Sequence, residues 1–399
     1  MEKPSAALEI TSKSIRIVIG YVLDDQVYVL YAMDKPIGSY VQNGLITNFP
    51  ALIDEVKKVG QISDPNAKLK IKISDVLLAL PPSGLEIFQT KQVTTVVSEE
   101  CKVTQLDIRN IYALISKERI PSNNEFIDVI PEMYILDQDR TFKYAPIGET
   151  SQTVTIKAKV HTLPRHVCSD YTNLVKNAGI NVRRTIISPF GVAELLGGYE
   201  DMPSDYFLVD MGAKMTTVSL VGQKQLYGST CFAWGGDEIT EKILEAFEIN
   251  YADAEKYKLM YGYDNRKMNF EPLVCTTSDE EGNVKKHTVS EMSKIVKEEL
   301  DNLINKLNYA ISELLKGYDS SYKTLPMVII GGASQLKGLK SYIEPKLAND
   351  FVILAKPKTL GARNPSYFNC LGMLKAASKY QNGFEDSLPK ISPINRVSK

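Results

Sequence analysis

The sequence predicts an α/β protein built from two duplicated lobes, with a smaller α+β subdomain inserted into the first lobe. Two distant stretches, 8–19 and 209–220, share the order strand, acid, bend and strand. Apolar strand-like runs alternate with helix-like runs over most of the chain, which is typical of α/β proteins. The segment 83–165 differs, because its strand-like runs surround a single helix.

The composition is that of a soluble globular protein. The chain has 399 residues, of which 44% are hydrophobic and 24% are charged, enough for two or more domains with separate cores. The formal net charge of -1 gives no overall field that would attract nucleic acid or an acidic membrane. We therefore expect no nucleic-acid partner.

The cysteines and the N-terminus indicate a reducing compartment. The five cysteines are odd in number and scattered, and no Cys-x-x-Cys occurs, which excludes a disulfide framework or a zinc ribbon as the simple interpretation. The N-terminus lacks the basic and apolar regions of a signal peptide, and no apolar run approaches the length of a membrane span. We expect a cytoplasmic protein.

The first lobe begins with a hairpin, a helix and a buried strand. The run 8–33 has two apolar arms with Asp24 and Asp25 at the tip between them. A helix is expected after Pro50, because apolar residues then recur at helical spacing. The run 72–82 reads as a buried strand that ends in proline.

The segment 83–165 reads as a small α+β module. Strands are expected at 90–97, 125–137 and 151–163. A helix over 104–119 begins at Thr104 with Asp107 three residues later, which resembles a capping box.

The chain then returns to alternating helices and strands. A helix over 166–179 ends at Gly179, in the C′ position that favours glycine. A strand follows at 180–188, and then a helix over 188–196 for which we predict Ser188 as N-cap and Pro189 as the first helical residue.

The second half of the chain again alternates strands and helices. A hairpin is expected over 206–226, a turn leading into a helix over 231–249, and a long amphipathic helix over 288–316. The run 325–347 reads as a strand, a glycine turn and a helix, whereas the polar tail from Tyr380 is expected to be disordered.

The two hairpins match in their charged residues. Glu9 aligns with Asp210 and Lys13 with Lys214, both at an offset of 201 residues. Short motifs also match by chance, so the hairpins alone leave duplication open. A third bend, Gly331-Gly332 after an apolar strand, strengthens the case, because glycines there let backbone amides approach a phosphate or nucleoside.

These residues resemble the actin/Hsp70/sugar-kinase nucleotide fold and, more closely, the FtsA family of bacterial cell-division proteins. The resemblance covers about 8–380. The inserted module lies where FtsA proteins carry their own subdomain, although the pilus-assembly PilM proteins carry a similar insertion. The stretches that support the resemblance are "SDVLLALPP", "DVIPEMYILD", "VTIKAKVH", "NLVKNAGI", "VDMGAKMTTVSLV", "GGDEIT", "ADAEKYKLMYG" and "VIIGGASQLKGL".

The resemblance implies a division of the chain into interleaved parts. Lobe 1 is formed by 1–82 and 166–200 and completed by about 356–380, with the inserted subdomain at 83–165. Lobe 2 is formed by 201–240 and completed by 317–355, and it carries an upper subdomain, 241–316, with the long helix. The segment 381–399 remains as a disordered tail.

The same resemblance implies a site for ATP and Mg²⁺ between the lobes. Two bends would grip the phosphates, and Asp210 would hold Mg²⁺ through water, because magnesium keeps much of its hydration shell. A glycine turn would face the adenosine, and one helix would lie beside ribose and adenine. The implied residues are Glu9, Thr11, Ser12 and Lys13 in the first bend; Asp210, Gly212, Ala213 and Lys214 in the second; Gly235 and Gly236 at the inner turn; Glu255 and Lys258 on the helix; and Gly331, Gly332 and Ala333 at the adenosine.

Both bends depart from the family pattern. Where the family has Asp-x-Gly-Thr, this chain has Glu9-Ile10-Thr11-Ser12, and where a glycine run ends in threonine it has Gly212-Ala213-Lys214-Met215. Lost glycines add Cβ atoms beside the phosphates. No residue suits the activation of water, so we expect ATP binding with weak ATPase activity at most. Lys13 and Lys214 have the alternative reading of solvated residues at hairpin tips.

The resemblance also implies partners. FtsA proteins bind the C-terminal peptide of the tubulin homologue FtsZ, assemble into actin-like protofilaments and work at the inner face of the cell membrane. The helix 288–316 has Ile295-Val296 where the family often has Pro-Arg, leaving Lys294 and Lys297 as candidate contacts. The tail carries two prolines and no apolar stripe, so an amphipathic membrane helix is not expected there.

The function expected from this resemblance is an ATP-binding scaffold of cell division that recruits FtsZ. Two alternatives stay open at this point. One is a PilM-like adaptor in a pilus or secretion machine, and the other is a small-molecule kinase on the same fold.

Overall fold

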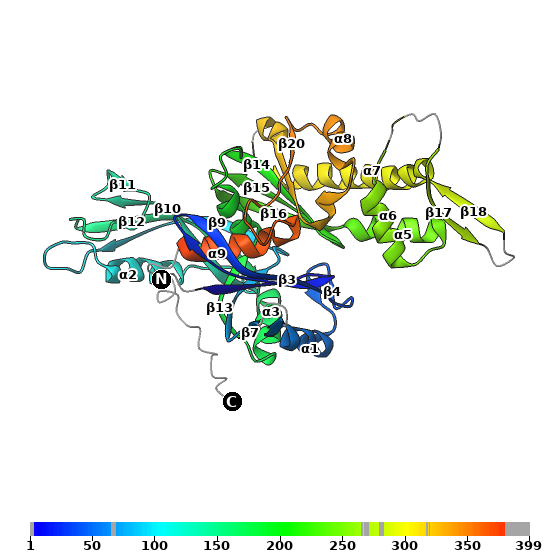
Figure 1. Ribbon diagram of the computed structural model, residues 1–399. Helices are drawn as coiled ribbons and strands as arrows, with labels where there is room; N and C mark the ends of the chain where they lie inside the picture. The colour runs from blue at the N-terminus through cyan, green and yellow to red at the C-terminus, as the bar shows by residue number, and fades with distance from the viewer. Residues whose placement is uncertain are drawn as a thin grey trace.

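The computed structural model describes residues 4–64, 69–264, 266, 271–278, 283–316, 318 and 320–379. Two five-stranded sheets form the centre, one four-stranded sheet extends to one side, and a helical arm extends to the other (Figure 1). The tail 381–399, for which the sequence predicts disorder, lies outside the described residues. None of the described helices combines the length and the apolar character needed to cross a bilayer.

The first lobe is a sheet covered by helices on both faces. Its strand order is β13-β8-β1-β2-β3, in which β1, β2 and β3 are antiparallel neighbours and β8 runs parallel to both β1 and β13. Helices α1 and α3 pack on one face, and α4 and α9 pack on the other. The bounds are β1 Ser5–Ile10, β2 Ser14–Leu23, β3 Gln26–Pro36, β8 Asp75–Leu80, β13 Asn181–Ile187, α1 Phe49–Val59, α3 Arg165–Asn177, α4 Ser188–Leu196 and α9 Phe368–Lys379.

The second lobe repeats this topology. Its order is β16-β15-β14-β19-β20, with the same antiparallel meander of three strands and the same two parallel strands beside it. Glu9 and Asp210 take equivalent places, each one residue before the end of the first strand of its meander. The predicted duplication of an α/β lobe is therefore confirmed. The bounds are β14 Asp205–Met211, β15 Met215–Gly222, β16 Gln225–Ala233, β19 Met327–Ile330 and β20 Val352–Leu354.

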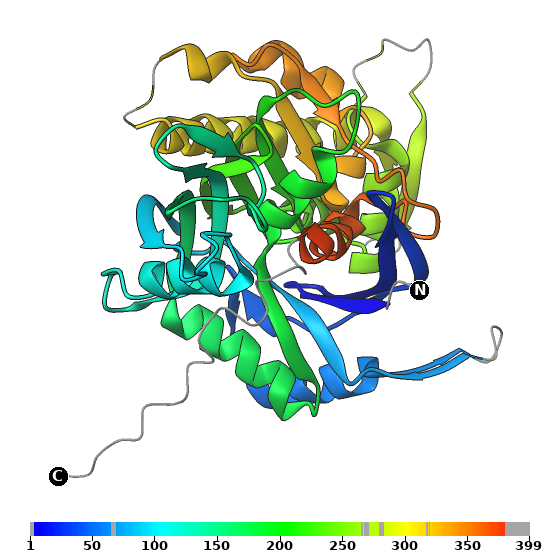
Figure 2. The ribbon, with the colours of Figure 1, turned by 90° about the vertical axis from the view of Figure 1, so that its left-hand side faces the viewer.

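The two sheets share a core through α4 and α9. The largest apolar cluster joins strands of the first lobe to Leu208, Val328 and Ile330 of the second, with residues of both helices between them. Figure 2, which looks nearly along α9, shows this helix between the elements of the two lobes. The burial of this shared core fixes one lobe against the other and thereby sets the position of the bends between them.

The helical arm packs on the outer face of the second sheet. A second apolar cluster combines this face with α5, α7 and α8. The long helix α7 begins at a Thr288 N-cap and presents buried residues at helical spacing, as the sequence predicts. The bounds are α5 Gly236–Phe247, α6 Tyr251–Tyr261, α7 Val289–Leu314, α8 Leu339–Ile343, β17 Leu273–Ser278 and β18 Val284–Thr288.

The inserted subdomain has its own sheet and core, as predicted. Its strand order is β11-β10-β12-β9, and helix α2 packs on β9 and β12. The Thr104–Asp107 capping box is present, with the Thr104 amide donating to the Asp107 carboxylate over 2.8 Å. The bounds are β9 Glu86–Thr95, α2 Gln105–Ile115, β10 Asn124–Leu136, β11 Arg140–Phe142 and β12 Thr153–Pro164.

The remaining elements are short. Two small ribbons and four 3₁₀ turns connect the larger elements. They are β4 Val41–Gln42, β5 Leu45–Ile46, β6 Gln61–Asp64, β7 Leu69–Lys72, η1 Ser320–Thr324, η2 Gly332–Gln335, η3 Glu344–Lys346 and η4 Pro365–Tyr367.

Two local predictions need correction, and one is confirmed. Ile187, not Ser188, is the N-cap of α4, because the Ser188 hydroxyl instead donates to the Leu80 carbonyl over 3.1 Å. The glycine turn after β19 leads into the 3₁₀ turn η2 rather than directly into an α-helix. Gly179, at φ +80°, ends the helix before it as predicted.

Candidate nucleotide-binding cleft

A cavity of about 820 Å³ lies between the lobes. Its walls come from the β1–β2 bend, the β14–β15 bend, the start of α5, helix α6, the turn η2 and the start of α9. Almost all of the residues implied by the sequence line it. They are Glu9, Thr11, Ser12, Lys13, Asp210, Gly212, Ala213, Gly236, Glu255, Lys258, Gly331, Gly332 and Ala333.

Lys214 and Gly235 are not among the lining residues. Gly235 supports the second bend from behind, since a Cβ there would overlap the Ala213 carbonyl. The Gly236 and Asp237 amides donate to the carbonyls of Gly212 and Ala213 over 3.0 and 2.9 Å. The positive charge of Lys214 partly offsets the effect of burial, which raises the pKa of Glu238. The lysine therefore lies on the side of the bend that faces α5.

The first bend bonds the amides of Thr11, Lys13 and Ser14 internally. Thr11 stands where the family has glycine, and its hydroxyl accepts from the amides of Lys13 and Ser14 over 3.3 and 3.0 Å. The Thr11 amide and hydroxyl both donate to the Ser14 carbonyl, each over 2.9 Å. This is a side-chain turn of the kind that serine and threonine form. Two amides that could face a phosphate therefore already have an acceptor.

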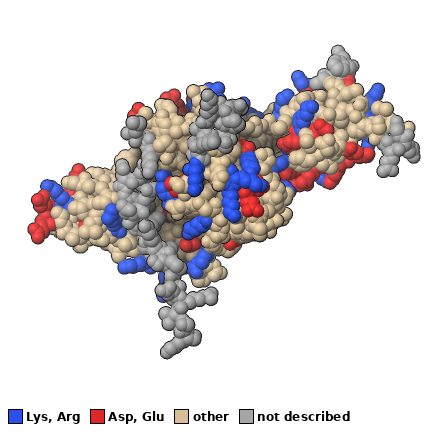
Figure 3. All heavy atoms as spheres, turned by 60° about the horizontal axis from the view of Figure 1, so that its bottom comes forward, with Lys and Arg blue, Asp and Glu red and all other residues tan. Residues whose placement is uncertain are grey.

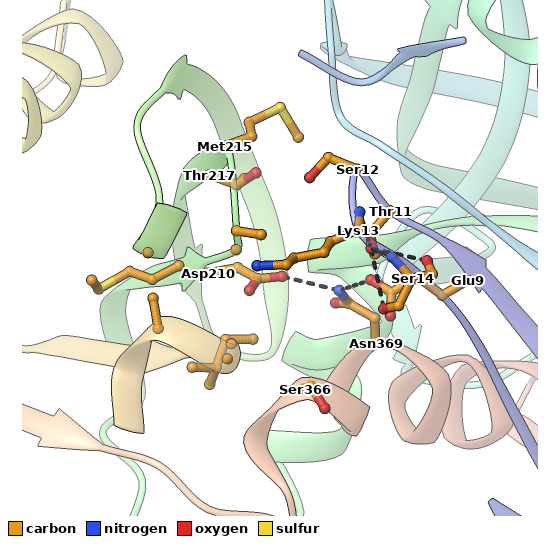
Figure 4. A pocket seen from close by; sticks show the side chains of 18 of the residues that line it. Glu9, Thr11, Ser12, Lys13, Ser14, Asp210, Met215, Thr217, Ser366 and Asn369 are labelled. Atoms are coloured by element: carbon orange, nitrogen blue, oxygen red, sulfur yellow. Dashed lines mark hydrogen bonds between the residues drawn. The ribbon is translucent and has the colours of Figure 1, made fainter. Parts of the chain in front are cut away.

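Asn369 joins the acids of the two bends. Its Nδ2 donates to Oε1 of Glu9 over 2.6 Å and to Oδ2 of Asp210 over 3.0 Å, as Figure 4 shows. Burial raises the pKa of both carboxyls, and in Glu9 the neighbouring charge of Asp210 raises it further. One amide from the start of α9 thus occupies the space between one acid of each lobe.

Glu9 also has a cationic partner. Arg16 lies directly opposite it in the β1–β2 register, and its Nη1 is 3.1 Å from Oε2 of Glu9. Nε of Arg16 is 2.9 Å from Oδ2 of Asp34. Arg16 and Asp34 both line the cavity. The first bend therefore neutralises its own acid with an arginine on the neighbouring strand.

Lys13 crosses the cleft. Its ammonium is 2.8 Å from Oδ1 of Asp237 at the start of α5, contacts the Tyr251 hydroxyl and lies 4.2 Å from the centre of that ring. Tyr251 in turn donates to Asp237 over 2.7 Å. Figure 4 shows the Lys13 side chain extended into the pocket, with Ser12 at the same bend. Through its ion pair with Asp237, Lys13 connects the first lobe to the second at the cavity.

Helix α6 supplies a buried polar network beside α5. Lys258 donates to Oε2 of Glu255, to the Thr240 hydroxyl and to the Gly236 carbonyl over 2.6, 2.8 and 2.9 Å. Burial lowers the pKa of Lys258. Burial raises the pKa of Glu255, but the charge of Lys258 and the hydrogen bonds from Lys258 and Thr240 outweigh it, so the net shift is downward.

The glycine turn after β19 leaves room for a ligand. Gly331 has φ +88°, and a Cβ there would collide with Asp210 and Met211, so a side chain is excluded on two grounds. At Gly332 nothing lies within 4 Å of where a Cβ would stand. This open backbone, next to Ala333, is what the close approach of an adenosine requires.

The residues that line the cavity fit a nucleotide better than they fit Mg²⁺. The cavity volume, the open Gly332 and the carboxylate of Glu255 suit a nucleoside. A cation between the two bends would meet Asn369 Nδ2, a donor, and a Glu9 already paired with Arg16. In the part of the chain that the structure describes, no three His, Cys, Asp or Glu residues form a direct metal cluster. Water-mediated Mg²⁺ at Asp210 stays a prediction.

Four residues of this site were missed from sequence: Arg16, Asp237, Tyr251 and Asn369. Arg16 could have been found, because a bend over 11–13 pairs it with Glu9 across the hairpin. Asp237 directly follows the predicted inner turn. Asn369 is 360 residues from Glu9 and 159 from Asp210, and Tyr251 is 238 from Lys13, so no local pattern connects these pairs.

Comparison with known protein families supports the fold and the inserted subdomain. The family model described as "Cell division protein FtsA" matches residues 207–372, and the model described as "SHS2 domain inserted in FTSA" matches residues 83–163. A cell division protein FtsA from Enterococcus hirae is 22% identical over 373 residues, which is 92% of this chain and 81% of the relative. One from Buchnera aphidicola subsp. Baizongia pistaciae is 23% identical over 397 residues, 95% of this chain and 92% of the relative.

Solved structures confirm the actin-like fold class. The PilM-PilN type IV pilus biogenesis complex aligns with TM-score 0.60 at 15% identity, covering 94% of this chain and 98% of that one. MreB 5 of Spiroplasma citri bound to AMPPNP aligns with TM-score 0.54 at 13% identity, covering 97% and 99%. Because family models match both the second lobe and the inserted subdomain, and relatives of this name align over more than nine tenths of its length, the chain belongs to the FtsA family.

Proposed function

We propose that this protein is an actin-like scaffold of cell division that binds ATP between its lobes, assembles into protofilaments and recruits FtsZ. The observation that carries the proposal is the cavity of about 820 Å³ on which both matching hairpins, the open glycine turn and the Glu255–Lys258 helix converge. Its occurrence in a chain of the FtsA family makes ATP the nucleotide of choice.

ATP would be held at both ends. Gly332, Ala333 and Glu255 would hold the nucleoside, and Lys13, Gly212 and Ala213 would face the phosphates. The negative charge of bound ATP would attract groups of both lobes and thereby hold the lobes together around the cavity. The residues that face the phosphates would bind and orient the nucleotide. We propose that it is hydrolysed weakly at most and that it acts as a cofactor of assembly.

FtsZ would bind along the exposed face of α7. Lys294 and Lys297 are exposed and lie one turn apart, and buried Val296 faces the opposite way. Acidic side chains gather on the arm where α5 lies (Figure 3), and the charges of Glu241 and Glu299 help burial to raise the pKa of Glu238. An acidic peptide is repelled from that side, and Lys294 and Lys297 are the contacts that we propose for it; without the peptide, Lys297 lies 3.6 Å from Asp301 of the same helix.

Self-assembly would follow the long axis that the two lobes define, and the filament would work at the inner face of the cell membrane. Both are proposals from family membership. Electron microscopy of the purified protein, with and without ATP, tests the first of them. Single protofilaments or pairs are expected with ATP.

Co-sedimentation with FtsZ tests the proposed function. The protein is expected to pellet with FtsZ polymers and to stay in the supernatant with polymers that lack the C-terminal peptide. Charge reversal of Lys294 and Lys297 to Glu should weaken binding at least about tenfold, because two attractive charges become repulsive. Lys242→Glu, an exposed change on α5, is the matched control. Equal pelleting with both FtsZ polymers, or with neither, would refute recruitment through this peptide and favour an adaptor role.

A further inference from the structure

We propose that Lys13 takes the place of a divalent cation in this cleft, so that the protein binds its nucleotide without Mg²⁺. The inference rests on the proposed nucleotide function and concerns how the phosphates are neutralised. Three features of the phosphate end carry it: the acids already have hydrogen-bond partners, the first bend bonds the amides of Thr11, Lys13 and Ser14 internally, and an ammonium group reaches into the cavity.

Both acids at the phosphate end already have a hydrogen-bond partner, Glu9 on both of its oxygens and Asp210 on Oδ2. Asn369 Nδ2 lies 2.6 Å from Glu9 and 3.0 Å from Asp210, and Arg16 neutralises Glu9 from the neighbouring strand over 3.1 Å. The Glu9 side chain is only 8% exposed, so a hydrated cation can reach little of it. Mg²⁺ prefers oxygen ligands and keeps several waters, whereas this space presents a nitrogen donor.

The first bend offers few backbone donors to a phosphate. The Thr11 hydroxyl accepts from the amides of Lys13 and Ser14, and the Thr11 amide donates to Ser14. In a phosphate-binding bend, such amides would point at the anion. With these donors used internally, the first lobe is left with the Ser12 amide and the side chains of the bend to meet a phosphate.

Lys13 supplies the positive charge among these groups. Its ammonium stands inside the cavity with 36% of the side chain exposed, which leaves it room to move toward an anion. Its present partner, Asp237, has two further sources of stabilisation: Tyr251 donates to it over 2.7 Å, and it lies in the first turn of α5, where the helix dipole favours an anion. Lys13 can therefore exchange Asp237 for a phosphate without leaving a buried carboxylate unpaired.

Without ligand, Lys13 adds an ionic contact between the lobes to the core that they share. In the present arrangement Lys13 joins the β1–β2 bend to α5 and α6. A nucleotide phosphate inserted at this point would be contacted by the first lobe through Lys13 and by the second through the backbone at Ala213, because the Gly212 amide already donates to the Met215 carbonyl over 3.0 Å. Its charge would replace that of Asp237 in the same ionic contact.

ATP titration with and without metal tests the inference. Trp234 is the only tryptophan of the chain and lines the cavity, so its fluorescence reports binding, and isothermal titration calorimetry provides the second measurement. The dissociation constant in EDTA is expected to lie within about threefold of that in excess Mg²⁺, a difference of less than 1 kcal/mol. Binding only in the presence of Mg²⁺ would overturn this inference and leave the proposed nucleotide function standing. No binding in either buffer would overturn both.

Variants at Lys13 identify the cation. Lys13→Met should weaken ATP binding in EDTA about tenfold or more, the usual effect of removing a hydrogen bond to a charged group. Lys13→Arg should keep binding within about threefold of the parent. Lys57→Met, the same change on an exposed residue of α1, is the control. Thermal unfolding shows whether Lys13→Met is folded. If it is not, Lys13→Arg and the parent decide. Unchanged binding by folded Lys13→Met in EDTA would refute the assignment.

Discussion

Asn369 is the residue on which the closed cleft depends most directly. One amide group serves two carboxylates whose charged form desolvation disfavours: Glu9, which is buried, and Asp210, which is half-buried. Buried acids normally need a cation or several donors. Glu9 has Arg16, whereas the hydrogen bond that the structure gives Asp210 is the one from Asn369. The stability of this site should therefore depend on pH.

Asp210→Asn tests this dependence. A carboxyl whose pKa is raised in the folded state stabilises the fold fully below its unfolded pKa, near 4, and loses that contribution as pH rises through the folded value. The substitution removes the titration and keeps an acceptor for Asn369. We expect the free energy of unfolding at pH 7 to rise by about 1 kcal/mol and its fall above pH 4 to become shallower. Urea denaturation between pH 4 and 8 measures both.

The exposed substitution Asp54→Asn, on α1, is the control and should leave the pH profile unchanged. An Asp210→Asn protein that is less stable than the parent at pH 7 but not at pH 4 would show that the Asp210 charge stabilises the cleft.

At the level of elements, the Thr11 hydroxyl of the β1–β2 bend holds two amides that a phosphate-binding loop would present to the anion. Thr11→Val removes the acceptor of the Lys13 and Ser14 amides but keeps a Cβ-branched side chain. The freed amides should bind ATP about three- to tenfold more tightly, at a cost of about 1 kcal/mol in stability. Trp234 fluorescence and thermal unfolding measure the two effects. Thr47→Val, at an exposed site, is the control, and unchanged affinity of Thr11→Val would disprove the role of the hydroxyl.

Helices α4 and α9 cross through backbone contact. A Cβ at Gly372 would overlap the backbone of Gly191, and a Cβ at Gly191 would lie 3.0 Å from the Gly372 carbonyl carbon. Gly372→Ala should therefore lower the free energy of unfolding by about 1–3 kcal/mol, as overpacking of a core does. Gly198→Ala, just after α4, is the matched control, because its Cβ would come no closer than 3.4 Å to Leu195. Equal stability of the two variants in urea would contradict a tight crossing.

Sequence reasoning predicted the elements better than their ends. The two hairpins, the inserted module and the Thr104 capping box follow from local patterns, and the structure confirms them. The predicted N-cap of α4 is wrong by one residue, because the Ser188 hydroxyl donates to the carbonyl of Leu80, which is distant in sequence. In the cleft, residues on the two bends could be found because the duplication repeats them. Asn369 could not, since only the crossing of α9 over both lobes brings it there.

For the whole molecule, the inserted subdomain is tied to the second lobe as well as to the first. Lys159 of β12 is 2% exposed and lies 3.1 Å from the ring centre of Tyr227 on β16, with Oε1 of Glu132 at 3.5 Å. Burial lowers the pKa of Lys159 to about 8. The fold therefore holds a cation between two domains in a place that disfavours its charge.

Lys159→Met tests this contact. Between pH 8 and the usual lysine value near 10.5, the unfolded chain binds more protons at this position than the folded one, so the stability of the parent should rise with pH in that window. The variant should lack this rise. Denaturation in urea at several pH values above 7 measures the difference, with Lys102→Met, an exposed site on the same subdomain, as the control. A variant whose profile keeps the parent's slope would place the titration elsewhere.

Helix α9 has one further consequence for the whole molecule. Its first turn carries Asn369 between the two acids, and its last residue, Lys379, is joined to Glu194 of α4 over 2.6 Å. Ten residues of helix make a stiff strut of about 15 Å between these points. The chain leaves α9 at the far end of that strut. A displacement of Lys379 along the helix axis is thus transmitted to Asn369 and to the two acids that it joins.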